Sequence, residues 1–309
     1  MQAYSSHSDP APRARADRAV FILCLGGALT ILYTVALSAT GMRAELAESN
    51  LQSNLMRASD FLGEHSSDIV LVGSSVGGRL LPRYFANGGL EIRNLGLDGS
   101  RPLFAFEVVD KRTPLPRLIV VETSTLFQPI MQNDITLRDA IASPGWNFSR
   151  FVPAMRPENR PSSLLYSWIK RMRDDRGAGQ ASDPYFKPDS KATGLEVSPR
   201  PNSPGWMPED QFDDVLRWVK RFRAEGVDVV LLRVPAGSGW GIPASGLARR
   251  LADTAGLPLL DPGPAMAAEG KALRFSDGMH LDSASAREVT ERIVQELRTM
   301  GYLADPPTR

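Results

Sequence analysis

The sequence predicts an α/β domain, a parallel sheet covered by helices on both faces, preceded by one membrane-spanning helix. Short apolar runs of the kind found in buried parallel strands alternate with longer segments whose apolar residues recur at helical spacing. This alternation is typical of a three-layer α/β/α sandwich. A chain of 309 residues is long enough to bury one large core or two small ones.

The N-terminal region predicts a disordered cytoplasmic tail followed by an anchor. Residues 1–18 are polar and contain Pro, Ser and Arg. Residues 19–42 are 24 residues without a charge, and a spanning helix needs about 20. Arg13, Arg15 and Arg18 precede this stretch, so the N-terminus is expected in the cytoplasm and the remainder beyond the inner membrane, in the periplasm or outside the cell.

A cleaved signal peptide is the alternative, with a cut near Ala39. The apolar stretch is longer than the usual signal core of about 7–15 residues, which favours an anchor. Cys24 lies inside the apolar run after Leu23 and does not resemble a lipoprotein site. Residues 43–66 have leucines at helical spacing and predict a linker helix between the membrane and the folded domain, which we place at residues 67–304.

Within that domain, five strands and three clear helices are predicted in alternation. The strands are expected at 68–73, 91–97, 117–123, 228–234 and 257–260, and the helices at 208–225, 241–254 and 283–300. Residues 126–207 interrupt the pattern with many prolines and aromatics, and only 161–173 suggest a helix there. We interpret this segment as an insertion over the active edge, a lid or a substrate platform, with a partly disordered insert as the alternative.

Composition excludes several classes of function. Lys plus Arg total 36 and Asp plus Glu total 35, so no charge excess indicates a nucleic-acid partner. A single cysteine excludes an internal disulfide and a cysteine-based zinc site, and neither a metal nor another cofactor is predicted. The three histidines are His7, His65 and His280, and His65 is expected only to contact the end of the linker helix.

Two motifs together predict nucleophilic catalysis. Gly73-Ser74-Ser75 ends the first predicted strand, and the carboxyl edge of an open α/β sheet is where ligands bind. Asp277 and His280 are three residues apart in a loop before the last helix, where the imidazole can serve as base and the carboxylate can orient it. Each motif has a structural alternative, because serines and aspartates also cap helices.

This combination resembles the SGNH/GDSL hydrolase superfamily, whose first block is Gly-Asp-Ser after strand one. Here that block is Gly73-Ser74-Ser75, which implies Ser75 as nucleophile, with Asp277 and His280 matching the late Asp-x-x-His block. The resemblance implies a flavodoxin-like sheet and covers about residues 68–300, apart from the insertion.

The oxyanion hole implied by the resemblance is matched only in part. A block like Asn-x-Gly after strand two supplies the oxyanion glycine, which here implies Gly96 within Asn94-Leu95-Gly96. The family's third block, Gly-x-Asn-Asp, is replaced by Glu122-Thr123-Ser124-Thr125, so Ser124 stands where an asparagine donor is expected.

An N-terminal anchor, a Gly-Ser-Ser block and a large insertion are similar to a membrane-anchored branch of that superfamily. This branch includes O-acetyltransferases of alginate and other exopolysaccharides and the D-alanyl transfer protein of teichoic acid synthesis, which commonly act with a multi-spanning acyltransferase. The expected function is serine-dependent acyl transfer to a cell-envelope or exported polysaccharide, with Arg79 and Arg101 as candidate substrate-binding residues. A stand-alone carbohydrate or lipid esterase and a catalytically degenerate scaffold remain the alternatives.

Overall fold

The computed structural model describes residues 12–44, 47–63, 68–127, 130, 132–149, 151–174, 191–192, 209–235, 237 and 245–303. The predicted tail up to residue 11, His65 and most of the second half of the insertion lie outside these residues.

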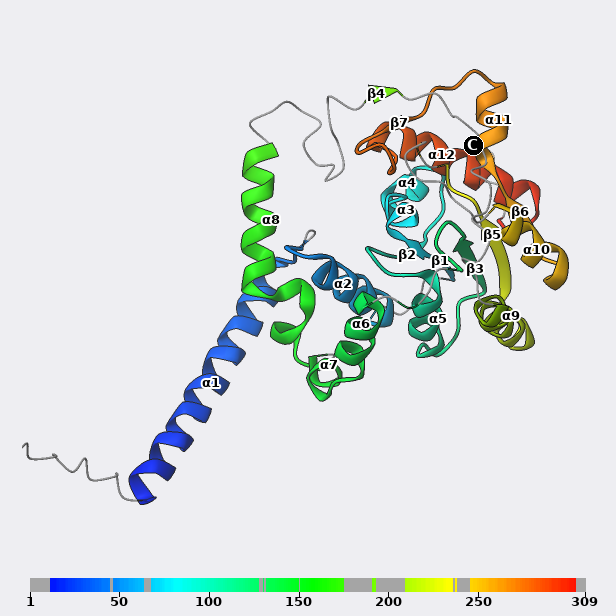
Figure 1. The fold of residues 1–309 in the computed structure, drawn as a ribbon. Helices are drawn as coiled ribbons and strands as arrows, with labels where there is room; N and C mark the ends of the chain where they lie inside the picture. The colour runs from blue at the N-terminus through cyan, green and yellow to red at the C-terminus, as the bar shows by residue number, and fades with distance from the viewer. Residues whose placement is uncertain are drawn as a thin grey trace, which may run out of the picture.

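A five-stranded parallel sheet forms the centre of the domain and confirms the predicted fold class (Figure 1). The spatial order is β2-β1-β3-β5-β6, which is the flavodoxin-like order when the five strands are counted along the chain. Every neighbouring pair is parallel. The strands are β1 (Ile69–Ser74), β2 (Arg93–Leu97), β3 (Leu118–Glu122), β5 (Asp228–Leu232) and β6 (Leu259–Leu260).

Helices cover both faces of the sheet because its strands are apolar on both sides. In β1, Val70 and Val72 pack into one core and Ile69 and Leu71 into the other. The first core is completed by α2 (Asn50–Gly63), α5 (Pro102–Asp110), α9 (Glu209–Ala224) and α10 (Ser245–Ala255). The second is completed by α3 (Ser75–Gly78), α4 (Pro82–Asn87), α11 (Pro262–Ala268) and α12 (Ser283–Thr299).

A long N-terminal helix, α1 (Pro12–Thr40), extends away from the domain (Figure 1). Its segment Ala16–Thr40 has 25 residues, a mean hydropathy of 2.3 and little burial, which suits a membrane span or a signal sequence. Residues 12–18 were predicted to belong to the disordered tail, but they are helical and continue the span. Proline at the first position of this helix is compatible with helical geometry, because its missing N–H would have no partner there.

The described part of the insertion is helical and touches two regions. Its elements are α6 (Gln132–Ala142), α7 (Pro144–Ser149), the 3-10 turns η1 (Pro153–Met155) and η2 (Pro157–Asn159), and α8 (Pro161–Asp174), which confirms the helix predicted at 161–173. A two-residue strand, β4 (Lys191–Ala192), pairs with β7 (Arg274–Phe275) just before the predicted Asp-x-x-His loop. By contrast, α6 and η2 contact α2, and η1 contacts α1. The lid or platform role therefore remains a prediction.

Candidate active site

The sheet order brings the candidate residues to one edge. The connections from β1 to β2 and from β2 to β3 place the second and third strands on opposite sides of β1. In such a sheet, the crevice at the carboxyl ends of the two strands where the order reverses is the usual ligand site. Ser74 ends β1 and Glu122 ends the adjacent β3, so both residues lie at this crevice.

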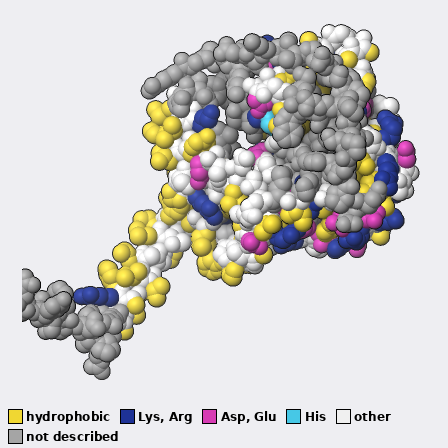
Figure 2. All heavy atoms as spheres, in the orientation of Figure 1, with side chains coloured by type: hydrophobic (Ala, Val, Ile, Leu, Met, Phe, Trp, Pro, Cys, Tyr) yellow, Lys and Arg dark blue, Asp and Glu magenta, His cyan; other side chains and the backbone are white. Residues whose placement is uncertain are grey.

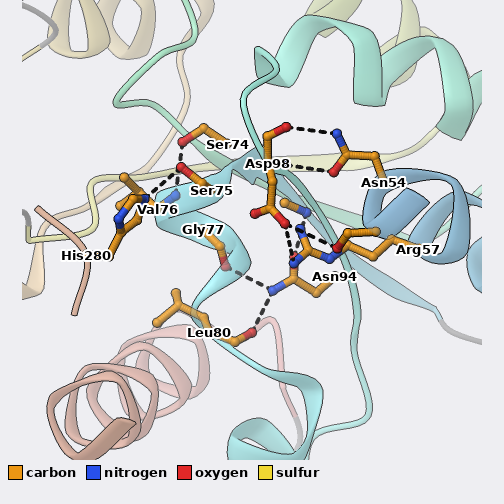
Figure 3. Close-up of polar contacts among 12 residues, drawn as sticks. Asn54, Arg57, Ser74, Ser75, Val76, Gly77, Leu80, Asn94, Asp98 and His280 are labelled. Atoms are coloured by element: carbon orange, nitrogen blue, oxygen red, sulfur yellow. Dashed lines mark hydrogen bonds and ion pairs between the residues drawn. The ribbon is translucent and has the colours of Figure 1, made fainter. Parts of the chain in front are cut away.

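Ser75 is the first residue of α3 and lies directly after β1. Its predecessor Ser74 is the N-cap, with an extended backbone, and the Ser74 hydroxyl accepts a hydrogen bond from the N–H of Val76 at 3.3 Å (Figure 3). The two serines therefore have different roles, because the Ser74 hydroxyl caps the helix and the Ser75 hydroxyl does not.

His280 contacts Ser75 across 205 positions of the sequence. The distance from His280 Nε2 to Ser75 Oγ is 2.8 Å (Figure 3). On the other side of the ring, His280 Nδ1 lies 2.7 Å from Asp277 Oδ2. Ser75, His280 and Asp277 therefore form a continuous hydrogen-bonded chain, and an arrangement of hydroxyl, imidazole and carboxylate of this kind can activate a serine.

The loop that holds His280 is closed by its own backbone. Ser276 N–H donates to the carbonyl of His280 at 2.8 Å, and Gly278 takes a positive φ of 81°, which a residue with a side chain rarely adopts. The Asp277 carboxylate also accepts from the backbone N–H of His280 at 2.8 Å. The alternative role of Asp277 as a cap of the last helix is wrong, because Asp282 caps α12 through a bond from Ser285 N–H.

Asp277 remains ionised over a wide pH range. Burial acts to raise the pKa of its carboxyl, but hydrogen bonds from His280 and Met279 outweigh burial and lower the pKa from its ordinary 3.8 to about 2. The side chain is nevertheless 40% exposed, whereas the His280 side chain is 10% exposed. The imidazole is thus shielded, and its orienting carboxylate meets solvent.

Glu122 is a buried carboxylate that the sequence did not single out. Its side chain is fully buried, and Oε2 accepts from Ser74 N–H at 2.9 Å and from the Ser74 hydroxyl at 2.8 Å. Its other oxygen, Oε1, accepts from Ser124 N–H at 2.5 Å. The sequence signal that could have indicated Glu122 is its place as a charged residue directly after the apolar run Leu118–Val121. Glu122 therefore ties the end of β3 to the turn that carries Ser75.

Two glycines of the Gly-Ser-Ser-Val-Gly-Gly motif make room for Glu122. A Cβ placed on Gly73 would lie 2.8 Å from Glu122 Cβ, and one on Gly77 would lie 3.2 Å from it. Packing against a side chain, rather than turn geometry, thus explains why these positions are glycine.

The structure corrects the expected role of Gly96. This residue lies inside β2, and its N–H donates to Asn94 Oδ1 at 2.6 Å, so the group is already used and is not directed at a bound substrate. Asn94 also donates through Nδ2 to the carbonyls of Gly77 and Leu80, at 2.9 and 2.6 Å (Figure 3). The Asn-x-Gly pattern therefore fastens α3 to β2.

Ser124 lies beside Ser74. The two hydroxyl oxygens are 3.3 Å apart, and Ser124 is 9% exposed. The position expected for an oxyanion donor is thus occupied by a hydroxyl that already contacts the N-cap serine.

The two candidate substrate-binding arginines have different surroundings. Arg101 is 4% exposed, and its backbone N–H donates to the carboxylate of Asp134 in α6 at 3.1 Å. Its guanidinium Nε lies 4.0 Å from the same carboxylate. Burial lowers the pKa of Arg101, while Asp134 acts in the opposite direction. Arg79 instead lines a hollow of about 680 Å³ between α2, α8 and the end of β2.

Arg57, on the same hollow, is a further residue that the sequence did not indicate. Its guanidinium pairs with Asp98 at 3.2 Å (Figure 3). It also lies 3.0 Å from the position that a Cβ on Gly78 would take. Asn54 of α2 holds the backbone of Asp98 through two bonds of 2.7 and 2.9 Å. The linker helix is thereby fixed to the loop after β2, at the same edge as Ser75.

Within the described ranges, no group of three His, Cys, Asp or Glu side chains is arranged to hold a metal ion.

Comparison with known proteins provides no closer assignment. No protein-family model matches the chain, and no curated protein matches its sequence. A solved structure from Bacteroides fragilis, described as a "putative acylhydrolase", aligns with 84% of this chain and 100% of its own at 15% identity and a TM-score of 0.38. That likeness is too distant to assign an activity.

Proposed function

We propose that the protein is a serine-dependent acyl-transfer enzyme, with Ser75 as nucleophile, His280 as general base and Asp277 as the residue that orients His280. The observation that carries this proposal is the chain of two short contacts, 2.8 Å from Ser75 Oγ to His280 Nε2 and 2.7 Å from His280 Nδ1 to Asp277 Oδ2.

In the proposed reaction, Ser75 Oγ attacks an ester carbonyl while His280 Nε2 takes its proton. The imidazolium that forms is stabilised by Asp277, which stays negative because of its low pKa. His280 then protonates the departing alkoxide and leaves an acyl group on Ser75. In the second half, His280 takes the proton of the acceptor hydroxyl, which attacks the acyl-enzyme. His280 then returns this proton to Ser75 Oγ as the ester bond to Ser75 breaks.

The negative oxygen of the tetrahedral intermediate needs donors. The N–H of Ser75, at the start of α3, is the proposed main donor, and the Ser124 hydroxyl is a second one if it turns from Ser74. Since Gly96 N–H donates to Asn94, we no longer assign it this role.

The proposed acceptor is a hydroxyl of a cell-envelope or exported polysaccharide, with α1 as an anchor that holds the domain outside the inner membrane. Retention of α1 is supported by its packing: Leu37 is 4% exposed, and the Tyr33 hydroxyl donates to the carbonyl of Asn159 at 2.6 Å. A signal sequence that is removed would have no need of these contacts. A multi-spanning acyltransferase as acyl donor belongs to the same proposal.

The test uses the full-length protein in detergent, with aryl acetate hydrolysis and labelling by a serine-directed phosphonate. Ser75→Ala and His280→Ala should each lower kcat by on the order of 10⁶-fold, down to background, as in other serine triads. Ser162→Ala, at an exposed position of α8, is the control and should keep full activity. Undiminished labelling of Ser75→Ala would exclude Ser75 as the nucleophile.

Acceptor choice separates the remaining possibilities. A transferase should acetylate an added glycan faster than it releases acetate, whereas an esterase should release acetate at a rate that the glycan does not change. A scaffold would be inactive in both measurements, and its Ser75→Ala variant would behave as the parent.

A further inference from the structure

The outer turns of α1 are covered on one face by the insertion. Thr30, Tyr33 and Thr34 are partly buried and Leu37 is buried, whereas their neighbours on the helix are exposed. These positions recur at helical spacing and so form one stripe. The covering segment is η1, which contacts α1 directly, and η2, whose Asn159 carbonyl accepts from Tyr33.

The height of this contact places the insertion at the membrane boundary. The 25-residue apolar segment Ala16–Thr40 is about 37 Å long, and the hydrocarbon core of a bilayer is about 30 Å thick, so only about 7 Å of this segment can lie outside the core. Tyr33 lies about 10 Å along the axis from the end of the helix at Thr40, and Thr30 about 15 Å. A segment that covers these residues must therefore reach the headgroup region when α1 spans the membrane.

The same segment exposes large apolar side chains. Phe148 in α7 is 55% exposed, Phe151 is 82% exposed and Met155 in η1 is 41% exposed. Single exposed apolar residues are ordinary, but here three occur within eight positions, in and next to the η1 segment that contacts the apolar helix α1. Figure 2 shows hydrophobic side chains along α1 and on the part of the domain next to it.

Cationic residues border this surface. A hollow of about 420 Å³ is lined by Phe151 and Trp146 together with Lys111, Arg112 and Arg156. Aromatic side chains next to Lys and Arg are typical of protein surfaces that lie at the headgroup level, where the rings reach the acyl chains and the cations meet phosphate.

We propose that α7 and η1, together with Phe151, form an interfacial membrane-binding element. It inserts Phe148, Phe151 and Met155 into the outer leaflet beside α1 and binds lipid phosphate groups through the neighbouring cations. The domain is then attached to the membrane at two points, α1 and this segment. The inference rests on retention of α1 as an anchor and is independent of the chemistry at Ser75.

The experiment measures the depth of single spin labels in the full-length protein. Cys24→Ser removes the only cysteine, and Phe148→Cys, Phe151→Cys or Met155→Cys then carries the label. Arg217→Cys on α9, at a side chain that is 75% exposed, is the control. The samples are vesicles of phosphatidylethanolamine and phosphatidylglycerol, with oxygen and a water-soluble nickel chelate as relaxation agents.

Labels at the three insertion positions should be relaxed several-fold more by oxygen than by the nickel chelate, and the control label should show the reverse. Carbonate-resistant flotation of the same samples verifies that α1 is inserted. If α1 is inserted and the label at Phe151 behaves as the label at Arg217, the proposal is wrong. Shielding of the insertion labels from both agents, seen only in native membranes, would indicate a protein occupant and would also overturn it.

Discussion

Replacing Glu122 with glutamine tests whether a buried carboxylate holds the turn that carries Ser75. Glu122 accepts three hydrogen bonds, two through Oε2 from Ser74 and one through Oε1 from the N–H of Ser124. Glutamine has nearly the same shape, so the substitution changes acceptor capacity and charge without making a cavity.

The expected cost follows from these contacts. One of the two carboxylate oxygens becomes an NH₂ group, and the amide can take two orientations. Fewer hydrogen bonds are lost when the amide oxygen faces Ser74 and the NH₂ group faces the Ser124 N–H. That N–H then lacks an acceptor in a buried site, which costs about 1–3 kcal/mol. The two bonds to Ser74 also lose their charge assistance, which contributes about 1 kcal/mol or less. Glu122→Gln should therefore lower the free energy of unfolding by about 1–4 kcal/mol.

The assay is urea unfolding of the full-length protein in detergent, followed by circular dichroism, with aryl acetate hydrolysis on the same samples. Glu91→Gln is the matched control, because the Glu91 side chain is 74% exposed and its contact with Arg93 is 3.7 Å long. The control should change stability by less than about 0.5 kcal/mol. A Glu122→Gln midpoint equal to that of the parent would refute the reasoning, because a neutral group would then serve these donors as well as a carboxylate.

Three further predictions concern the same edge of the sheet. Gly96→Ala would place a Cβ 2.3 Å from the backbone nitrogen of Gly78. Urea unfolding should therefore show a free energy of unfolding lower by about 1–3 kcal/mol or more. A stability equal to that of the parent would mean that the backbone segments at Gly96 and Gly78 are further apart. Asp277→Asn should lower kcat for aryl acetate by about 10⁴-fold while phosphonate labelling of Ser75 slows in parallel, and a loss below tenfold would show that His280 is oriented by other groups. Because the pKa of Asp277 is depressed to about 2, its contribution to stability should be complete above about pH 4 and lost as the pH falls towards 2. The urea midpoints of the parent and of Asp277→Asn should therefore differ at neutral pH and converge on acidification.

The fold class could be read from local pattern because its signals are local. The run Ile69–Val72 is apolar at every position, and only a strand buried on both faces requires that. The uncharged stretch behind α1 and the helical spacing in α9 and α12 are equally short-range features, and the structure has helices at these places. Boundaries were less exact, since α1 begins earlier than expected, at Pro12.

Part of the candidate site could also be predicted. Asp277 and His280 lie in one short loop, so their spacing alone indicated a pair, and the scarcity of histidine left one candidate base for Ser75. Their contact with Ser75 is decided by the parallel sheet, which brings the end of β1 and the loop before α12 together.

Other features depended on tertiary structure entirely. The acceptor used by Gly96 N–H, the burial of Arg101 against Asp134 and the burial of Glu122 behind Ser74 all involve contacts whose energy comes from neighbours in space. A sequence indicates which residues are apolar, charged or able to turn, because these are properties of single residues and short segments. It does not indicate which oxygen a given N–H meets, since that depends on strand order and on which side chains the packed core excludes from water.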